Sequence, residues 1–381
     1  MEYVKRKIEN ESRVTWIDSL KGIAVCGVVW VHSGGGNLGN LFDPLGKAGA
    51  YWVQMLFILT VYLSCHSLKN RLEACRKVNN RTVFLQWFLE RVWKLTPLYY
   101  FMLLMYLMIV PEGANIWLGL VADRPSGLNV LTHLLYLHSL FPYYANSIMW
   151  VEWYLGVMFL YLILTPFAYQ YIRQSKSVVA FSIVIVIMSV LATFVLSYMH
   201  PTSEEYIWEG WVYTYSFIVH LPALAFGILF FYLERIYFKN RTSKVMCGFS
   251  IAGYVFLSYL GYYTENRFLQ VSKIAGFSLV FLLFILSKKM TDNYLLNNRM
   301  WRIIGRNSYA IYLCHYLLIF VGDYFINDDL VANVLCSPLL WQVIKCAVII
   351  LSCLFFSIVY DKIIGGRMYI WGKRKISEFF A

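Results

Sequence analysis

Charged residues are scarce in this 381-residue chain: Asp, Glu, Lys and Arg together make up only 14% of it, whereas 60% of the residues are hydrophobic. A soluble domain of this length needs more polar surface than that composition supplies. The alternation of apolar and polar residues that marks a membrane-spanning β-barrel is also missing. Several uninterrupted apolar stretches instead reach the roughly 20 residues that cross a bilayer as a helix. The sequence therefore predicts an all-α integral membrane protein.

Metal-binding patterns are absent as well. The eight cysteines form no Cys-x-x-Cys pair and no His–Cys cluster with zinc spacing, so no metal site is predicted. The sequence has no repeat of fixed period, no low-complexity tract and no long hydrophilic insert, which favours a single membrane domain. The first apolar stretch lacks a small-residue cleavage site and is expected to stay as a signal anchor.

Ten apolar stretches are predicted to span the membrane. They cover residues 14–34, 50–68, 93–110, 149–171, 178–198, 211–233, 245–263, 268–287, 306–325 and 341–363. A further apolar segment, 128–144, is short and contains His133, His138 and Pro142. We expect it to be re-entrant or interfacial, because counting it as a span would invert every later loop. An eleven-span arrangement remains the alternative.

Lysine and arginine gather on one side of the ten predicted spans. They lie in loops 69–92, 172–177, 234–244 and 288–305 and in the tail after residue 363. This pattern predicts that these loops and both termini face the cytoplasm of a multi-pass plasma-membrane protein. It also accounts for the net charge of +12 without a nucleic-acid partner. The predicted organisation is a cytoplasmic segment at 1–13, a transmembrane domain at 14–363 and a basic cytoplasmic tail at 364–381.

The first predicted span carries three ionisable side chains, Asp18, Lys21 and His32. Lys21 and His32 are eleven residues apart, so they share a helix face and lie about 16 Å apart along its axis. Asp18 is one turn before Lys21 and can pair with it. Ionisable groups in a span usually point to a cavity or a partner, which makes all three candidates for function. The competing interpretation is that Asp18 and Lys21 are interfacial anchors and His32 is a polar end residue.

Four further side chains are candidates on the same grounds. Arg91 and Lys94 place two cations near the cytoplasmic boundary, which suits phosphate binding, although an ordinary basic flank would look the same. Glu152 lies among aromatic residues near the outer interface. A raised pKa there would allow it to take part in proton transfer; the alternative is that it is only an interfacial acid. His315 lies about three turns inside the ninth predicted span. It is interpreted either as a functional residue or as a hydrogen-bonded packing residue.

Four stretches in order along the chain resemble the acyltransferase-3 family of membrane acyltransferases, which includes many bacterial O-antigen and capsule O-acetyltransferases. The stretches are Ile17–Ala24 continuing to His32, Arg91–Pro97, Trp153–Pro166 and Gly305–His315. The sequence departs from the family pattern at three positions. Lys21 and Lys94 stand where the family has arginine, and Met158 stands where many members have glutamate. Lysine keeps the charge but loses the bidentate fork of arginine.

The resemblance implies a membrane-bound O-acyltransferase with no resident cofactor. Its co-substrate would be a cytoplasmic acyl-CoA, acetyl-CoA above all, and its acceptor a hydroxyl of a cell-surface or lipid-linked glycan. The expected catalytic residues are His32 as general base, with Glu152 and His315 as further candidates, and the expected donor-binding residues are Asp18, Lys21, Arg91 and Lys94. A multi-span transporter of a small solute or glycan precursor is the alternative, since inward-facing ionisable groups also serve transport. A structural or sensory membrane protein is a third possibility.

Overall fold

The computed structural model describes residues 15–75, 79–110, 125–174, 177–199, 205–236, 243–264, 266–287, 294, 296–326 and 328–380. The regular structure in these residues is entirely helical, which confirms the predicted fold class. The elements in chain order are α2 Thr15–Trp30, η1 Val31–Gly35, α3 Asp43–Lys47, η2 Ala48–Trp52, α4 Val53–Ala74, α5 Asn80–Ile109, α6 Gly127–Leu134, η3 His138–Leu140, α7 Trp153–Gln174, α8 Val178–Leu196, α9 Glu205–Gly210, η4 Trp211–Tyr215, α10 Phe217–Ile236, α11 Lys244–Tyr263, α12 Arg267–Leu286, α14 Arg299–Arg306, α15 Ser308–Phe325, α16 Asp328–Val334, α17 Pro338–Tyr360, η5 Asp361–Gly365 and α18 Gly366–Phe379.

Eight helices in the described part of the chain are long and apolar enough to cross a membrane. They coincide with eight of the ten predicted spans. The other two predicted spans are also helical and fall on α2, continued by η1, and on α15, which have 16 and 18 residues. Both of these helices carry ionisable side chains, which lowers their apolar character. The chain is therefore a multi-pass membrane protein.

The segment predicted to be re-entrant or interfacial forms two short helical pieces. Residues 128–144 contain all but the first residue of α6, a helix of eight residues, and the whole of η3, a single turn of three. A bilayer crossing needs roughly 20 helical residues, so neither piece can span. The expectation of a short, non-spanning segment is confirmed.

The predicted loop at 69–92 is mostly helical. Helix α4 continues to Ala74, and α5 begins at Asn80, capped by the Asn79 side chain, which accepts from the amide of Arg81. The two extensions are joined by Arg71, whose guanidinium donates two hydrogen bonds to Glu90, at 2.8 and 2.7 Å. Hydropathy marks only the part of a helix that lies in lipid. Polar residues with good helix propensity can extend the helix beyond that part, so its ends are not marked by hydropathy.

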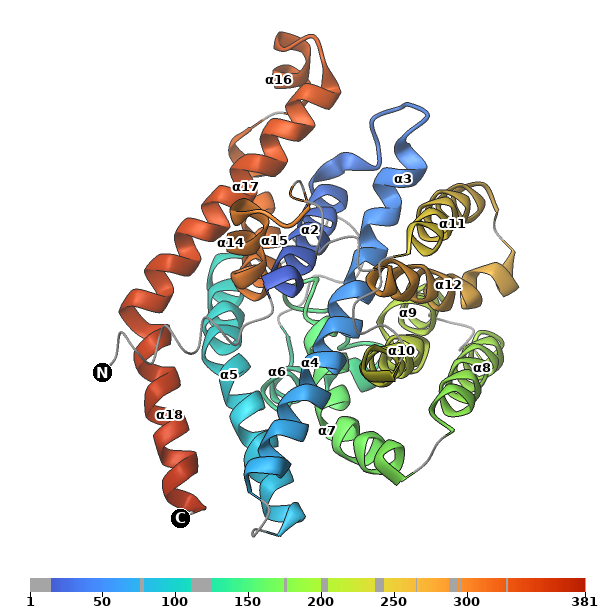
Figure 1. Cartoon of the computed structure of the whole chain (residues 1–381). Helices are drawn as coiled ribbons and strands as arrows, with labels where there is room; N and C mark the ends of the chain where they lie inside the picture. The colour runs from blue at the N-terminus through green and yellow to red at the C-terminus, as the bar shows by residue number, and fades with distance from the viewer. Residues whose placement is uncertain are drawn as a thin grey trace.

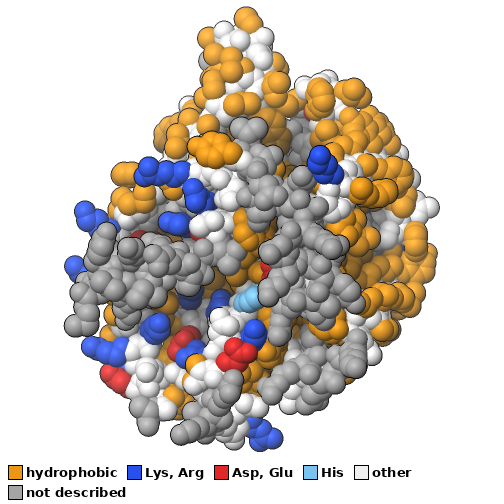
Figure 2. Space-filling model, in the orientation of Figure 1, with side chains coloured by type: hydrophobic (Ala, Val, Ile, Leu, Met, Phe, Trp, Pro, Cys, Tyr) orange, Lys and Arg blue, Asp and Glu red, His pale blue; other side chains and the backbone are white. Residues whose placement is uncertain are grey.

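The helices form an inner group and an outer layer (Figure 1). The apolar windows of α4, α7 and α10 are mostly buried, whereas those of α8 and α11 are mostly exposed. The exposed side chains of α8 and α11 are large and apolar, as expected for surfaces that face lipid. In Figure 2, hydrophobic side chains cover the side formed by α8, α11 and α12, while lysine and arginine gather over the side formed by α5, α14 and α18.

Candidate active site: two cavities that meet at Tyr312

A first cavity of about 200 Å³ lies between α2, α4, α5, α7, α14 and α15. We call it the basic cavity. Its charged lining residues are Asp18, Lys21, Arg91, Lys94 and Arg306. The structure thus brings together all four residues that the sequence suggested for donor binding. They come from two helices that are distant in sequence, and they face a shared space rather than lipid.

Two glycines allow the helices of this cavity to approach closely. Helix α14 packs against α2 backbone to backbone: a methyl group added to Gly305 would overlap the carbonyl oxygen of Asp18, and one added to Gly22 would overlap that of Trp301. Small residues at helix contacts in membranes serve this purpose. The close approach carries Arg306, the residue after Gly305, to the mouth of the basic cavity.

Arg306 is a site residue that the sequence reasoning missed. Its Nε atom donates to Oδ2 of Asp18 at 3.2 Å, and the carboxylate is 7% exposed. The basic cavity therefore holds four cations against one carboxylate, a balance that favours a polyanionic ligand. The available signal was its position directly after Gly305 in one of the four family stretches.

A second cavity of about 280 Å³ lies beside His32. We call it the histidine cavity. Aromatic side chains form much of its lining, together with a few polar groups. These residues are His32, Tyr51, Gln54, Asn146, Trp150, Trp153, Tyr213, Thr214, Tyr215, His220, Tyr312 and Tyr316. A small number of polar groups among aromatic walls is the usual make-up of a small-molecule site.

His32 lies in a π-helical turn, Val31–Gly35, that follows directly on α2. Single π-helical turns inside helices often occur at functional sites. The turn is held by Trp30, whose indole donates to the carbonyl of Gly35 at 3.0 Å. From α17, the Gln342 amide donates to the Ser33 hydroxyl at 2.7 Å and to the carbonyl of Trp30 at 3.2 Å. These contacts set the direction of the His32 side chain.

His32 and His315 are hydrogen-bonded to each other, with Nδ1 of His32 lying 2.8 Å from Nε2 of His315. The Nδ1 atom of His315 lies 2.8 Å from the carbonyl oxygen of Tyr312. A carbonyl only accepts, so Nδ1 of a neutral His315 carries the hydrogen and its Nε2 is the acceptor. His32 then donates from Nδ1, which leaves the lone pair on its Nε2. The backbone of α15 therefore determines that Nε2 is the basic nitrogen of His32.

His220 also lines the histidine cavity, but its ring is held on both sides. Its Nε2 donates to the carbonyl of Thr214 at 2.8 Å, and its Nδ1 accepts from the Gln54 amide at 3.0 Å. Its ring stacks on Trp153 with centroids 4.9 Å apart. With both ring nitrogens occupied, His220 orients the indole of Trp153 and is not available as a base. Its sequence position, near the start of an ordinary apolar span, gave no signal for this role.

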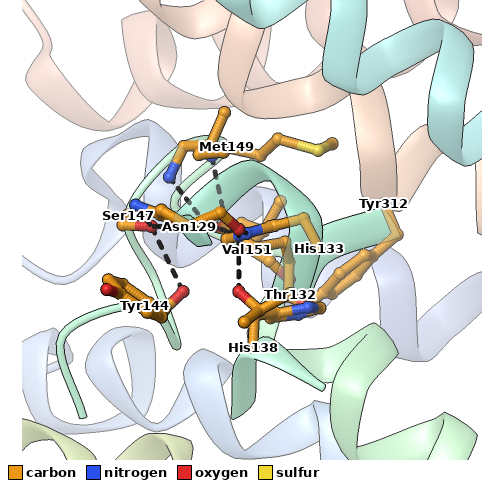
Figure 3. Close-up of polar contacts among 11 residues, drawn as sticks. Asn129, Thr132, His133, His138, Tyr144, Ser147, Met149, Val151 and Tyr312 are labelled. Atoms are coloured by element: carbon orange, nitrogen blue, oxygen red, sulfur yellow. Dashed lines mark hydrogen bonds and ion pairs between the residues drawn. The ribbon is translucent and has the colours of Figure 1, made fainter. Parts of the chain in front are cut away.

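Tyr312 lines both cavities. Its hydroxyl donates to the carbonyl of Val151 at 3.1 Å, and its ring lies 4.6 Å from that of Tyr154. The contact between Tyr312 and Val151 is visible in Figure 3. Tyr312 also precedes His315 by one helical turn. The boundary between the basic cavity and the histidine cavity is therefore formed by an aromatic side chain next to the histidine pair.

Glu152, expected near the site as a proton-transfer group, lies outside the lining of both cavities. Its side chain is fully buried, and its carboxylate accepts from the amide of Ile148 at 2.7 Å and from that of Met149 at 3.1 Å, and it lies 3.3 Å from Nε2 of His133. Figure 3 shows His133, His138 and Met149 in one group. Burial acts to raise the pKa of Glu152, but His133, His138 and the Ile148 amide bring it below its ordinary value. The expectation of a raised pKa was wrong, because the chain supplies buried donors.

The Glu152 cluster supports a strained residue of the histidine cavity. Trp150 has a φ of 62°, a left-handed conformation that is unusual for a bulky side chain. Its ring packs on Tyr316, with centroids 5.3 Å apart. The amides that Glu152 holds belong to the two residues immediately before Trp150. Backbone strain of this kind persists where neighbouring contacts enforce it. Glu152 thus acts on the cavity through the placement of Trp150.

Comparison with known proteins gives one clear result. The model of the family described as "Acyltransferase domain" matches residues 14–358. No curated protein and no solved structure matches the chain. The matched region includes both cavities, the paired histidines and the α2–α14 contact. Because the match covers nearly the whole chain, this protein belongs to the acyltransferase-3 family of membrane acyltransferases.

Proposed function

We propose that this protein is a membrane-bound O-acetyltransferase that uses acetyl-CoA in the basic cavity and acetylates a sugar hydroxyl in the histidine cavity. The observation that carries the proposal is the meeting of the two cavities at Tyr312, with His32 and His315 on one side and four cations on the other.

The basic cavity supports a phosphorylated donor. Coenzyme A is a polyanion whose phosphates suit Arg91, Lys94 and Arg306, and arginine can bind a phosphate with two parallel hydrogen bonds. The inner wall of the same cavity contains Leu56, Met158 and Leu162. An apolar wall beyond the cations fits a chain that carries its charge at one end and its thioester at the other.

The histidine cavity supports a sugar acceptor. The C–H faces of a pyranose are apolar and pack on aromatic rings such as Trp150, Trp153 and Tyr316, while hydroxyl groups need the few polar side chains between them. The lone pair on Nε2 of His32 provides a base for one hydroxyl. A neutral imidazole is suited to this task near pH 7.

The reaction then follows from the tautomer. Nε2 of His32 takes the proton of the sugar hydroxyl while the hydroxyl oxygen attacks the thioester carbonyl carbon and the new C–O bond forms. The tetrahedral intermediate collapses, the C–S bond breaks, and the proton passes from His32 to the leaving thiolate of CoA. The imidazolium that forms in between still donates from Nδ1 to His315, so the dyad stabilises the charge as it develops.

The orientation of the two cavities follows from the charge of the loops. The basic cavity lies at the helix ends that the positive-inside pattern assigns to the cytoplasm, where CoA is present. His32 lies about 16 Å from Lys21 along the helix axis, toward the outer face of the membrane. The protein would thus bind its donor from inside and modify a glycan on the outer side of the plasma membrane.

The direct test uses purified protein reconstituted in lipid vesicles with radiolabelled acetyl-CoA and the O-deacylated surface polysaccharide of the host cell. The wild-type protein should transfer label to the polysaccharide, and His32→Ala should reduce the rate by at least about 100-fold. His66→Gln, on α4 outside both cavities, is the matched control and should retain activity. Full activity of a correctly inserted His32→Ala protein would refute the assigned role. Absence of transfer from any acyl-CoA, together with loss of an exported solute in cells that lack the gene, would favour a transporter.

A further inference from the structure

A third cavity, of about 500 Å³, opens beside the histidine cavity. We call it the outer cavity. It is formed by the segment before α7, by α9 with η4, and by the start of α12. Its lining residues are Pro142, Tyr143, Asn146, Tyr206, Ile207, Glu209, Gly210, Tyr213, Thr214, Tyr215, Arg267 and Gln270. The proposed reaction involves none of the charged residues among them.

The outer cavity and the histidine cavity are adjacent. They share four lining residues, namely Asn146, Tyr213, Thr214 and Tyr215. The outer cavity is therefore the neighbouring space for the part of a ligand that extends away from His32. The volume of the outer cavity exceeds that of the histidine cavity, 500 against 280 Å³, so the extension can be larger than the group that reacts.

Asn146 stands at the junction with an unsatisfied acceptor. Its side chain is only 5% exposed, it lines both cavities, and within the described residues its Oδ1 atom has no hydrogen-bond partner. A buried amide oxygen without a donor is destabilising. Such a group is expected to receive its donor from a ligand, and a sugar hydroxyl is a donor of the right kind.

The wall of the outer cavity is built to keep its shape. The indole of Trp208 donates to the carbonyl of Leu196 at 2.9 Å, and the indole of Trp211 donates to that of Ser139 at 2.9 Å. These two bonds tie the α9–η4 segment to α8 on one side and to η3 on the other. The lining on either side of these two anchors, from Tyr206 to Tyr215, is therefore restrained before a ligand arrives, which lowers the entropic cost of binding.

We infer that the outer cavity is a binding subsite for the sugars next to the one that is acylated, so that the acceptor is an oligosaccharide or longer glycan and not a free monosaccharide. This inference rests on the proposed function for the identity of the reacting sugar. Tyr206 and Tyr213 offer aromatic faces, while Glu209, Arg267 and Gln270 offer hydrogen-bonding groups to ring hydroxyls. Asn146 bridges the two subsites.

The test measures how binding and transfer depend on acceptor length. The probes are mono-, di-, tri- and tetrasaccharide fragments of the O-deacylated surface polysaccharide of the host. Binding is measured by calorimetry on the full-length His32→Ala protein without donor, and transfer on the wild type. The affinity and the transfer rate should each increase by about 10-fold or more from the mono- to the trisaccharide. This is the effect expected of one or two added hydrogen bonds. Asn146→Leu, Arg267→Ala and Gln270→Ala should each reduce this gain toward one, while Gln86→Ala on α5 keeps it.

Asn146→Leu also provides a check on folding. It replaces the buried amide with an apolar side chain that has the same number of heavy atoms and the same branching, so comparison of its thermal midpoint with that of the wild type shows whether the variant is folded. Equal affinity for all fragment lengths, or a length gain unchanged in all three variants, would overturn the subsite while leaving the acyltransferase proposal intact. A length-dependent affinity that needs Asn146, in a protein that transfers no acyl group, would uphold the subsite and reject the proposed function.

Discussion

The Nδ1 atom of His32 lies 2.8 Å from the Nε2 atom of His315, and the planes of the two rings are within 11° of each other. The pair connects η1, the turn after α2, to the middle of α15, across 283 positions of sequence. Since the carbonyl of Tyr312 holds the hydrogen on Nδ1 of His315, a backbone atom determines which nitrogen of His32 carries the lone pair. His315 is therefore a positioning residue in the proposed reaction.

The role of His315 predicts a difference between two substitutions. His315→Leu removes the acceptor for the Nδ1 hydrogen of His32, so kcat should fall about 10- to 100-fold with little change in KM for the donor. His315→Gln can still accept from His32 through its amide oxygen and should keep a larger share of the rate. Steady-state kinetics in vesicles decide the matter. Equal losses in both variants, or no loss in either, would show that tautomer selection is unimportant.

Removal of Arg306 should weaken donor binding. Arg306→Ala removes one of four cations from the basic cavity and leaves the Asp18 carboxylate without this partner. A charged hydrogen bond contributes about 1.5–3 kcal/mol, so KM for acetyl-CoA should rise about 10-fold or more while kcat changes less. Arg302→Ala is the control, because Arg302 lies on the same helix and does not line the cavity. If both variants raise KM equally, the effect is one of general charge.

Close packing of α2 on α14 predicts a strong effect of a single methyl group. Gly305→Ala would drive its Cβ into the carbonyl oxygen of Asp18, whereas the Cβ of Gly248→Ala in α11 meets no atom within 4 Å. The first change should lower the free energy of unfolding by about 1–3 kcal/mol or more. The second should be neutral or stabilising by up to about 1 kcal/mol, since alanine favours helix. Thermal unfolding in detergent compares them, and a stable Gly305→Ala protein would contradict the packing described.

Acid should destabilise the segment before α7. Burial lowers the pKa of His138 from 6.5 to about 3, so between these values the unfolded chain binds a proton that the folded protein does not. The free energy of unfolding should therefore fall as the pH drops from about 6.5 toward 3. Glu152, with a pKa below its ordinary 4.5, stabilises above that value and loses its contribution as the pH falls further.

The measurement is the thermal midpoint in detergent between pH 7 and pH 4. His138→Phe should show a weaker pH dependence over this range than the wild type, whatever its absolute stability. Asp329→Asn, at an exposed position on α16, is the control and should follow the wild type. An unchanged pH dependence in His138→Phe would mean that other groups control the acid response.

Tyr312 should control which acyl groups pass between the cavities. Tyr312→Ala opens the boundary, so the ratio of butyryl to acetyl transfer should rise about 10-fold, the order expected when a pocket gains room for one or two methylene groups. Tyr312→Phe keeps the ring and loses only the hydrogen bond to Val151, so its selectivity should match the wild type. Mass spectrometry of the product with mixed acyl-CoA donors gives both ratios. Unchanged ratios in Tyr312→Ala would place the passage elsewhere.

The spans could be predicted from the amino-acid sequence, because the free energy of placing a helix in lipid is a sum over its own residues. Every predicted span falls on a helix, including α2 and α15, and the short segment around His133 does not cross. Family motifs identified Asp18, Lys21, Arg91 and Lys94 as a group, and the structure places them around one cavity. Helix ends were less predictable, since α4 and α5 continue beyond the apolar residues that mark their spans.

Which side chains meet depends on the packing of helices that are distant in sequence. Arg306 contacts Asp18 across almost 290 positions of sequence, and His315 contacts His32 across more than 280. No local sequence pattern encodes such pairs. Glu152 looked like an interfacial acid because the sequence does not display the amides of Ile148 and Met149 that surround it in the folded chain. Hydrophobicity is a property of a segment, whereas a tautomer, a buried charge or a shared cavity depends on the neighbours that packing supplies.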